Sequence, residues 1–225
     1  MKKLVSIIFA TLLVVFIAFG AMAEMTISAP YVKKGPKLDG KLDDEAWKIV
    51  EQKGAKAEIA YYLNALAVKE DKSEVMVCWD NNFLYIAFKN MQKEDTIFAE
   101  AVADGASIWV TDDDNEVFLS TTYPGTRPFL QAITNAIGVK TSFNVGTIQD
   151  WDVTVEVYKG YWISEFAIPF DMLNAWPEAS EEWAINLCRR YANGASTERE
   201  WMTWCNLPVT TFLDPLVFGV LLFTK

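Results

Sequence analysis

The chain has 225 residues, a formal net charge of −10, nine tryptophans and no histidine. The absence of histidine excludes Ser-His and Cys-His nucleophilic catalysis, as well as histidine-ligated zinc and haem. A chain this acidic is repelled by nucleic acids and by anionic membranes, so neutral ligands are the natural expectation. The composition leaves two main classes, a binding protein rich in aromatic side chains and an enzyme that works with carboxylates alone.

The N-terminal segment is predicted to be a cleaved signal peptide. A pair of lysines precedes an apolar run at residues 4–19, and residues 21–23 form a small-x-small cleavage site. The apolar run is shorter than the roughly 20 residues that a membrane-spanning helix needs. We therefore expect cleavage after Ala23 and export to the periplasm or the extracellular space. The mature chain, residues 24–225, is expected to form a single domain without membrane association.

The mature chain reads mainly as short strands separated by turn residues. The clearest hairpin joins residues 73–79 to residues 83–89 through a turn of aspartate and asparagine, which tolerate left-handed backbone. Residues 152–158 alternate, with their valines predicted to face inward, and a Lys-Gly turn leads into residues 162–168. Further strands are expected at residues 116–120, 129–135, 183–191 and 217–223.

Helix is scarce in the predicted structure. The pattern of residues 43–52 predicts a helix capped by Asp43, with Trp47 on its buried face. A short second helix is expected at residues 169–174, where Pro169 suits the first turn. Many short strands with so little helix predict an all-β fold. We expect an antiparallel β-sandwich, of the jelly-roll or immunoglobulin-like kind, with one or two short helices.

The three cysteines, Cys78, Cys188 and Cys205, cannot all form pairs within one chain. Cys78 and Cys188 lie in strand-like apolar runs, where a buried free thiol is common. A disulfide between Cys188 and Cys205 is an open alternative, because exported proteins fold in an oxidising compartment. The spacing contains no paired-cysteine metal motif.

Six segments can be compared with known families as a set. They are PKLDGKLDDEAW at 36–47, VCWDNNFLYIA at 77–87, DDDNEVFL at 112–119, WISEFAIPF at 162–170, INLCRR at 185–190 and FLDPLVFG at 212–219. In this order they resemble the blocks of family 9 carbohydrate-binding modules. The resemblance implies a β-sandwich that binds sugars, often attached to xylan- or cellulose-degrading enzymes and often carrying structural calcium. It also implies kinship with the DOMON sandwiches, some of which bind haem.

The resemblance places a sugar between two aromatic rings, with polar side chains reaching its hydroxyls. The first ring falls at or beside Trp109, and the second falls on Phe212, where the family typically has tryptophan. Glu116 matches the hydroxyl-binding glutamate of the family. Chemically, a pyranose has an apolar C–H face that an indole covers, while amides and carboxylates fix its hydroxyls. The ordinary alternatives are a core tryptophan, edge packing of the phenyl ring and a solvated carboxylate.

The strand predicted at residues 129–135 departs from the family pattern. Sugar-binding members carry an arginine shortly before an asparagine there, and this chain has none. Gln131 and Asn135 are the amides that could substitute, without the bidentate charged donor of arginine. The departure keeps open a sandwich whose sugar pocket has decayed.

Asp112, Asp113 and Asp114 are weak candidates for the calcium site that the resemblance implies. Calcium requires several oxygen ligands, but these residues lack the spacing of a calcium-loop motif. A run of charges is more often a solvated loop. No other metal or cofactor is expected.

The tryptophans divide by their sequence patterns. Trp47, Trp79, Trp162 and Trp183 lie on regular amphipathic patterns and are expected in the core. Trp201 and Trp204 fall in a less regular stretch, residues 198–206, which could line a groove or fill the core.

The leading interpretation is an exported, non-catalytic protein that binds plant-type poly- or oligosaccharide of the xylan or cellulose class, in support of polysaccharide breakdown. A glycoside hydrolase is a candidate protein partner. One alternative is a glycoside hydrolase with paired carboxylates, roughly 5 to 9.5 Å apart, although the Glu-x-Asp-x-x-Glu strand of common sandwich-fold glucanases is absent. A DOMON-like haem or electron-transfer domain with methionine ligands, and a decayed sandwich used for protein–protein assembly, also remain open.

Overall fold

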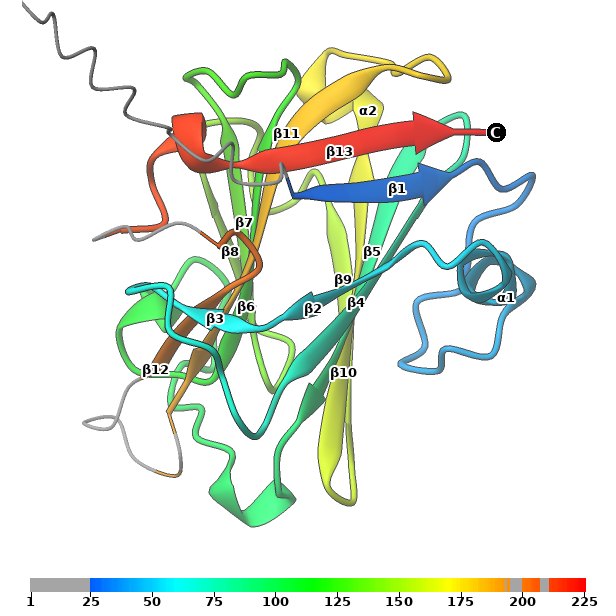
Figure 1. Ribbon diagram of the computed structural model, residues 1–225. Helices are drawn as coiled ribbons and strands as arrows, with labels where there is room; N and C mark the ends of the chain where they lie inside the picture. Colours follow the sequence, from blue (N-terminus) through cyan, green and yellow to red (C-terminus); the bar gives the residue numbers. More distant parts are fainter. Residues whose placement is uncertain (1–24, 193, 195–199, 207–210) are drawn as a thin grey trace, which may run out of the picture.

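The structure is a computed structural model that describes residues 25–192, 194, 200–206 and 211–225. Its strands form two sheets that pack against each other around an apolar core (Figure 1). The predicted signal peptide, residues 1–23, lies outside the described residues. Within the described part of the chain, no helix is long and apolar enough to cross a membrane.

Thirteen strands and two short α-helices lie within the described residues. The strands are β1 Thr26–Pro30, β2 Lys56–Ile59, β3 Tyr61–Tyr62, β4 Ser73–Trp79, β5 Phe83–Met91, β6 Asp114–Ser120, β7 Leu130–Asn135, β8 Lys140–Phe143, β9 Asp152–Tyr158, β10 Tyr161–Pro169, β11 Glu182–Tyr191, β12 Glu200–Thr203 and β13 Gly219–Thr224. The helices are α1 Glu45–Gln52 and α2 Phe170–Leu173, with 3₁₀ turns at Glu94–Thr96, Ile108–Val110 and Pro215–Val217.

The first sheet has the order β1-β13-β11-β6-β7-β8, with β12 paired to β11 and β3 paired to β12. The second sheet has the order β2-β4-β5-β10-β9. All strand pairs are antiparallel except β1 with β13, which run parallel. The predicted fold, an antiparallel β-sandwich with one or two short helices, is confirmed.

Alternation along the strands fills the core and leaves a second set of side chains outside it. On β6, Val117 and Leu119 point into the layer between the sheets, so Glu116 and Phe118 point away from the second sheet. Phe88 and Phe166 enter the same layer from the second sheet. The outer face of the first sheet is therefore free to carry a separate site.

The long amphipathic strands were predictable nearly to the residue. The strands expected at 73–79 and 152–158 are β4 and β9 with the same bounds, and the ends of the other expected strands lie within two residues of prediction. The strands that were not predicted are β1, β2, β3, β8 and β12, of two to five residues each. Segments this short show too few alternations to carry a pattern of their own.

Two details of the prediction are wrong. The helix begins at Glu45 with Asp44, not Asp43, as the preceding residue, and the Asp44 carboxylate accepts a hydrogen bond from the backbone of Lys37 instead of capping the helix. Val157 was expected to face inward but is 43% exposed, because β9 is an edge strand of its sheet. The predicted buried face of the helix, Ala46, Trp47 and Val50, is confirmed.

The segment that precedes α1 is fixed to the second sheet by one buried carboxylate. Glu165 on β10 accepts hydrogen bonds from the backbone amides of Asp39 at 3.1 Å and Gly40 at 2.7 Å, and from the Trp47 indole at 2.8 Å. Gly40 has φ +74°, a left-handed conformation suited to glycine. We call these four residues the clip. Burial raises the pKa of Glu165 to about 7, although the three N–H donors lower it.

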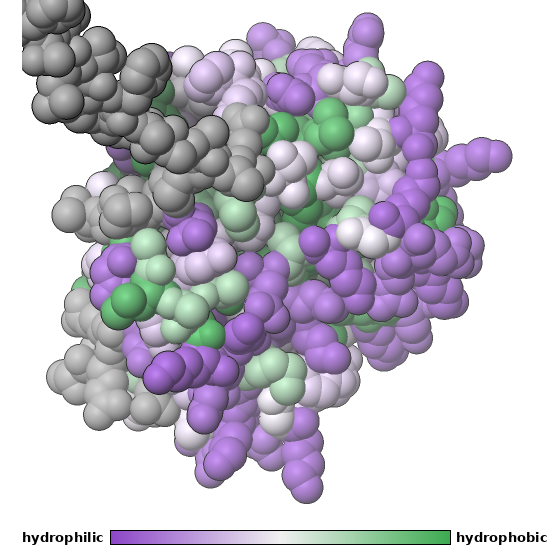
Figure 2. Space-filling model, in the orientation of Figure 1, coloured by the Kyte–Doolittle hydropathy of each residue, from purple (hydrophilic) through white to green (hydrophobic). Residues whose placement is uncertain are grey.

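Hydrophilic side chains cover the part of the surface near α1, at the right of the view, and apolar side chains reach the surface in scattered places (Figure 2). Hydrophilic residues thus cover the solvent side of the helix, while Trp47, on the opposite face of the same helix, is wholly buried.

Candidate functional site

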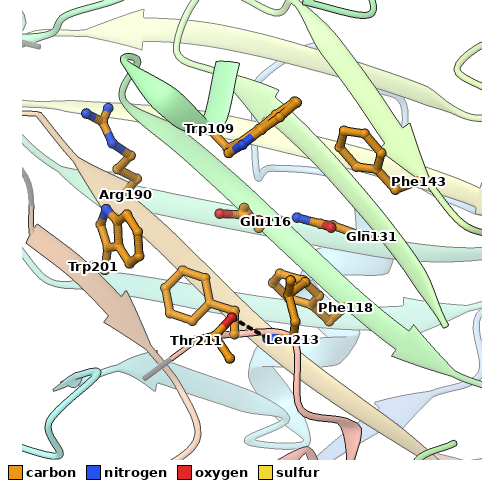
Figure 3. Close-up of a pocket in the computed structure, with 10 residues that line it drawn as sticks. Trp109, Glu116, Phe118, Gln131, Phe143, Arg190, Trp201, Thr211 and Leu213 are labelled. Atoms are coloured by element: carbon orange, nitrogen blue, oxygen red, sulfur yellow. Dashed lines mark hydrogen bonds between the residues drawn. The ribbon is translucent and has the colours of Figure 1, made fainter. Parts of the chain in front are cut away.

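A cleft of about 330 Å³ opens on the outer face of the first sheet (Figure 3). Its lining residues are Trp109, Glu116, Phe118, Gln131, Phe143, Arg190, Trp201, Thr211, Phe212 and Leu213. They come from β6, β7, β8, β11 and β12, from the 3₁₀ turn at Ile108–Val110, and from the segment before β13. The cleft is thus assembled from segments that lie far apart in the sequence.

The floor of the cleft follows from strand alternation and register. Glu116 and Phe118 share the outer face of β6, and Gln131 lies opposite Phe118 on β7. The Gln131 amide Nε2 donates to Glu116 Oε2 at 2.8 Å. This hydrogen bond holds an amide and a carboxyl group side by side at the centre of the cleft.

Aromatic rings stand around this polar floor. Figure 3 shows Trp109 and Trp201 on different sides of the Glu116 side chain. Trp109 is half-buried and packs edge-on against Phe143, with ring centroids 4.9 Å apart. Trp201 is 38% exposed and tilts against Phe212 at 6.0 Å. Two indole rings therefore have free surface beside one pair of hydrogen-bonding side chains.

The floor also contains a buried charge cluster. Arg190 lines the cleft from β11 while its guanidinium Nη1 donates to the Asp112 carbonyl. Burial raises the pKa of Glu116 to about 7, opposed by the Gln131 hydrogen bond and by Arg190. Asp114, the preceding outward residue of β6, is fully buried; desolvation and the neighbouring Glu116 raise its pKa well above the usual value. Two carboxyl groups with raised pKa values and one guanidinium thus lie together at the floor of the cleft.

Four of the five residues predicted to bind ligand are brought together by the fold. Trp109, Glu116, Gln131 and Phe212 all line the cleft. Phe212 is only 7% exposed and is packed between the rings of Phe118 and Trp201. It therefore contributes mainly as support for Trp201.

Asn135 is not part of the cleft. Its Nδ2 donates to the Ala101 carbonyl at 3.0 Å and to Asp112 Oδ2 at 2.8 Å, and its Oδ1 accepts from the Ile137 and Val139 amides. These bonds tie the end of β7 to the neighbouring loops. The structure thus gives Asn135 a positioning task outside the cleft.

Arg190 is the charged lining residue that sequence reasoning missed, while Trp201 was left open between groove and core and lines the cleft. Arg189 and Arg190 are adjacent on β11, so alternation sends them to opposite faces. Arg189 points inward and donates to Ser73 Oγ and Gln92 Oε1, which leaves Arg190 for the outer face. Arg190 thus lines the cleft from β11, with its buried guanidinium engaged by the Asp112 carbonyl. The paired arginines in a strand-like run were the available signal.

The acidic loop does not fit a calcium ion. Asp112 accepts hydrogen bonds from the backbone amides of residues 100–101, and Asp113 accepts from three donors, one of them Gln92. Asp114 faces the cluster beneath the cleft. Among the described residues there is no group of three or more acidic, cysteine or histidine side chains that could hold a metal ion. The expectation of calcium at Asp112, Asp113 and Asp114 is therefore corrected, because the first two carboxylates are occupied in holding loops.

The cysteines and tryptophans complete the comparison with prediction. Cys78, Cys188 and Cys205 are all buried and free, so the open alternative of a Cys188–Cys205 disulfide is not formed. The four tryptophans expected in the core are at most 7% exposed. Trp204 is in the core and Trp201 lines the cleft. Each of the two alternatives left open by the sequence, groove and core, thus applies to one of these tryptophans.

A family model described as "Carbohydrate family 9 binding domain-like" matches residues 38–225. The chain belongs to this family. The match begins one residue before Asp39, the first residue of the clip, and includes every residue that lines the cleft. Within this family 9 domain, the cleft and the clip occupy the outer faces of opposite sheets. No curated protein matches the chain at a significant level.

Solved structures show the same fold. A family 9 carbohydrate-binding module from Caldicellulosiruptor kristjanssonii in complex with cellotriose is 18% identical, with a TM-score of 0.69 over 89% of this chain and 94% of that chain. A module from the same organism in complex with glucose is 17% identical, with a TM-score of 0.67 over 89% and 96%. A putative carbohydrate-binding protein from Bacteroides uniformis is 13% identical, with a TM-score of 0.67 over 89% and 100%.

Proposed function

We propose that this family 9 domain is a non-catalytic carbohydrate-binding module that takes a poly- or oligosaccharide of the xylan or cellulose class. The observation that carries the proposal is the pair of partly exposed indoles, Trp109 and Trp201, beside the hydrogen-bonded Glu116 and Gln131. Two structures with the same fold were solved with cellotriose and with glucose.

The arrangement suits a neutral sugar. An indole face covers the apolar C–H face of a pyranose, while the carboxyl group of Glu116 and the amide of Gln131 reach its hydroxyls. The volume of about 330 Å³ lies at the lower end of the roughly 300–1,000 Å³ typical of small-molecule sites. Binding by a few rings and hydrogen bonds gives modest affinity, in the micromolar to millimolar range.

We further propose that the protein acts outside the cytoplasm, after cleavage of residues 1–23, in support of polysaccharide breakdown. The charged start, the apolar run and the small-x-small site support export. A glycoside hydrolase is the partner that fits this role, since a binding module without catalysis serves an enzyme that acts on the same polymer.

Titration calorimetry of residues 24–225 against xylo- and cello-oligosaccharides tests the proposal. We expect saturable binding that Trp109→Ala weakens by at least tenfold, because the mutation removes one stacking face. Trp176→Ala is the matched control, since Trp176 is 55% exposed and does not line the cleft; its affinity should equal that of the unmodified protein. Absence of heat with every sugar, or unchanged affinity in Trp109→Ala, would overturn the proposal.

A further inference from the structure

A second hollow adjoins the cleft across Trp201. It has a volume of about 470 Å³ and is lined by Tyr62, Leu63, Asn64, Glu200 and Trp201. Trp201 also lines the first cleft. The two hollows therefore share one indole and lie next to each other at the β3–β12 edge of the first sheet.

The backbone of this edge fixes the shared ring. β3 pairs antiparallel with β12, with Tyr62 opposite Met202. The Leu63 amide donates to the Trp201 carbonyl at 3.2 Å, and Met202 is wholly buried in the core. The backbone hydrogen bond to Leu63 and the buried side chain of Met202 thus hold this part of β12 in place, while Trp201 is 38% exposed.

The lining of the second hollow offers hydrogen-bonding groups that suit sugar hydroxyls. The Tyr62 hydroxyl donates to Glu200 Oε2 at 3.3 Å, which positions a phenol and a carboxylate together. Asn64 adds an exposed amide, whose Oδ1 accepts from the Leu66 backbone at 3.0 Å. Hydroxyl, carboxylate and amide groups beside an indole repeat the chemistry of the first cleft.

We propose that the sugar site continues across Trp201 into a second subsite formed by Tyr62, Asn64 and Glu200, so that the preferred ligand is an oligosaccharide long enough to occupy both hollows. This inference rests on the proposed function. Among the lining residues that the structure describes, the charged one is Glu200, and the others are hydroxyl, amide, aromatic and aliphatic side chains that suit a neutral sugar unit. Continuity with the first cleft identifies the occupant as the same chain of sugars.

The test is a series of calorimetric titrations with cello- and xylo-oligosaccharides from one to six units. The unmodified protein should bind the longer members at least tenfold more tightly than the shortest member that binds. The double variant Tyr62→Phe/Glu200→Ala should lose that gain, about tenfold for the longest oligosaccharides, and should bind the shortest ones with unchanged affinity. Asn64 is left unchanged because it holds its own turn.

Tyr161→Phe is the matched control, because it removes a tyrosine hydroxyl on β10 in the other sheet and should change no affinity. Thermal unfolding monitored by circular dichroism checks that each variant is folded. The inference is overturned, while the proposed function stands, if sugars bind with no dependence on length or if the double variant weakens short and long oligosaccharides equally. Absence of binding by every oligosaccharide overturns both. The second subsite is supported if the double variant loses affinity for the longer oligosaccharides and binds the shortest ones as tightly as the unmodified protein does.

Discussion

The clip and the cleft are built from the same two residue types on opposite sides of the sandwich. Each places a buried glutamate beside an indole, and in each the pKa of the glutamate is raised to about 7 by burial. In the clip, the chain itself supplies three N–H donors to Glu165, and Trp47 is wholly buried. In the cleft, Glu116 accepts from Gln131, while Trp109 and Trp201 keep exposed ring surface. Whether such a pair is structural or binds a ligand depends on whether the chain fills the space beside it.

The clip and the cleft are also separated in space. In Figure 1, α1 lies at the right of the molecule, and β3 and β12 lie at the left. Substitutions at one end should therefore leave the other intact, and their effects should add.

The largest expected effect comes from removing the indole of the clip. Trp47→Ala should lower the free energy of unfolding by about 3–5 kcal/mol, because it deletes a fully buried aromatic ring and the donor to Glu165. Denaturant unfolding followed by fluorescence measures the change. Trp176→Ala, at an exposed position, should stay within about 0.5 kcal/mol. If Trp47→Ala lowered the free energy of unfolding by less than Trp176→Ala does, the clip would not stabilise the fold.

The next effect is the pH dependence of stability that Glu165 confers. Its pKa is about 7 in the folded protein against 4.5 for an ordinary glutamate, so folding favours the protonated form. This contribution is complete below about pH 4.5 and is lost as the pH rises through 7. It amounts to about 3 kcal/mol at most.

Urea titrations at pH 5 and pH 8 test this contribution. Glu165→Gln should show a smaller fall in stability between the two pH values than the unmodified protein. Its stability should be lower at both, because the amide nitrogen would face N–H donors. An identical fall in both proteins would remove Glu165 as the source.

A smaller effect is expected from the matching substitution in the cleft. Glu116→Gln keeps the shape and the partner Gln131, but replaces a carboxyl group that ionises near pH 7. Affinity for the sugar at pH 8 should fall about tenfold, which is about 1.4 kcal/mol and within the range for hydrogen bonds to charged groups. Stability at pH 8 should not fall, since a buried charge has been removed. Calorimetry and urea unfolding on one sample measure both, and a loss of stability without loss of affinity would make Glu116 a second clip residue.

The smallest effect is the response to reductant. Cys78 packs with Trp47 beneath α1, and Cys188 packs with Phe118 and Phe212 beneath the cleft. Both thiols are free and buried, and burial raises their pKa values. Dithiothreitol should therefore leave the melting temperature unchanged, and thiol reagents should label the protein only on unfolding. Labelling of Cys188 but not Cys78 in the folded protein would show that the floor of the cleft opens while the clip stays closed.

The comparison also shows which local patterns were informative. The strands β4 and β9 carry enough alternating residues to define themselves, and Trp47 and Trp183 are placed in the core by the periodicity of their own segments. β3 has two residues and gains its conformation only by pairing with β12. Its position could not be predicted, because the partner strand lies about 140 residues later in the chain.

The sequence alone determined the sandwich class, most strand positions and the core tryptophans, because periodicity is a local property, and the family resemblance indicated four residues of the cleft. Tertiary structure alone decided that Arg190 lines the cleft, that Trp201 forms its second exposed indole, and that Asn135 lies outside it. These assignments depend on which strands become neighbours and which side chains are already engaged by the chain. Strand pairing between distant segments is set by the packing of the whole sandwich, so no single segment contains it.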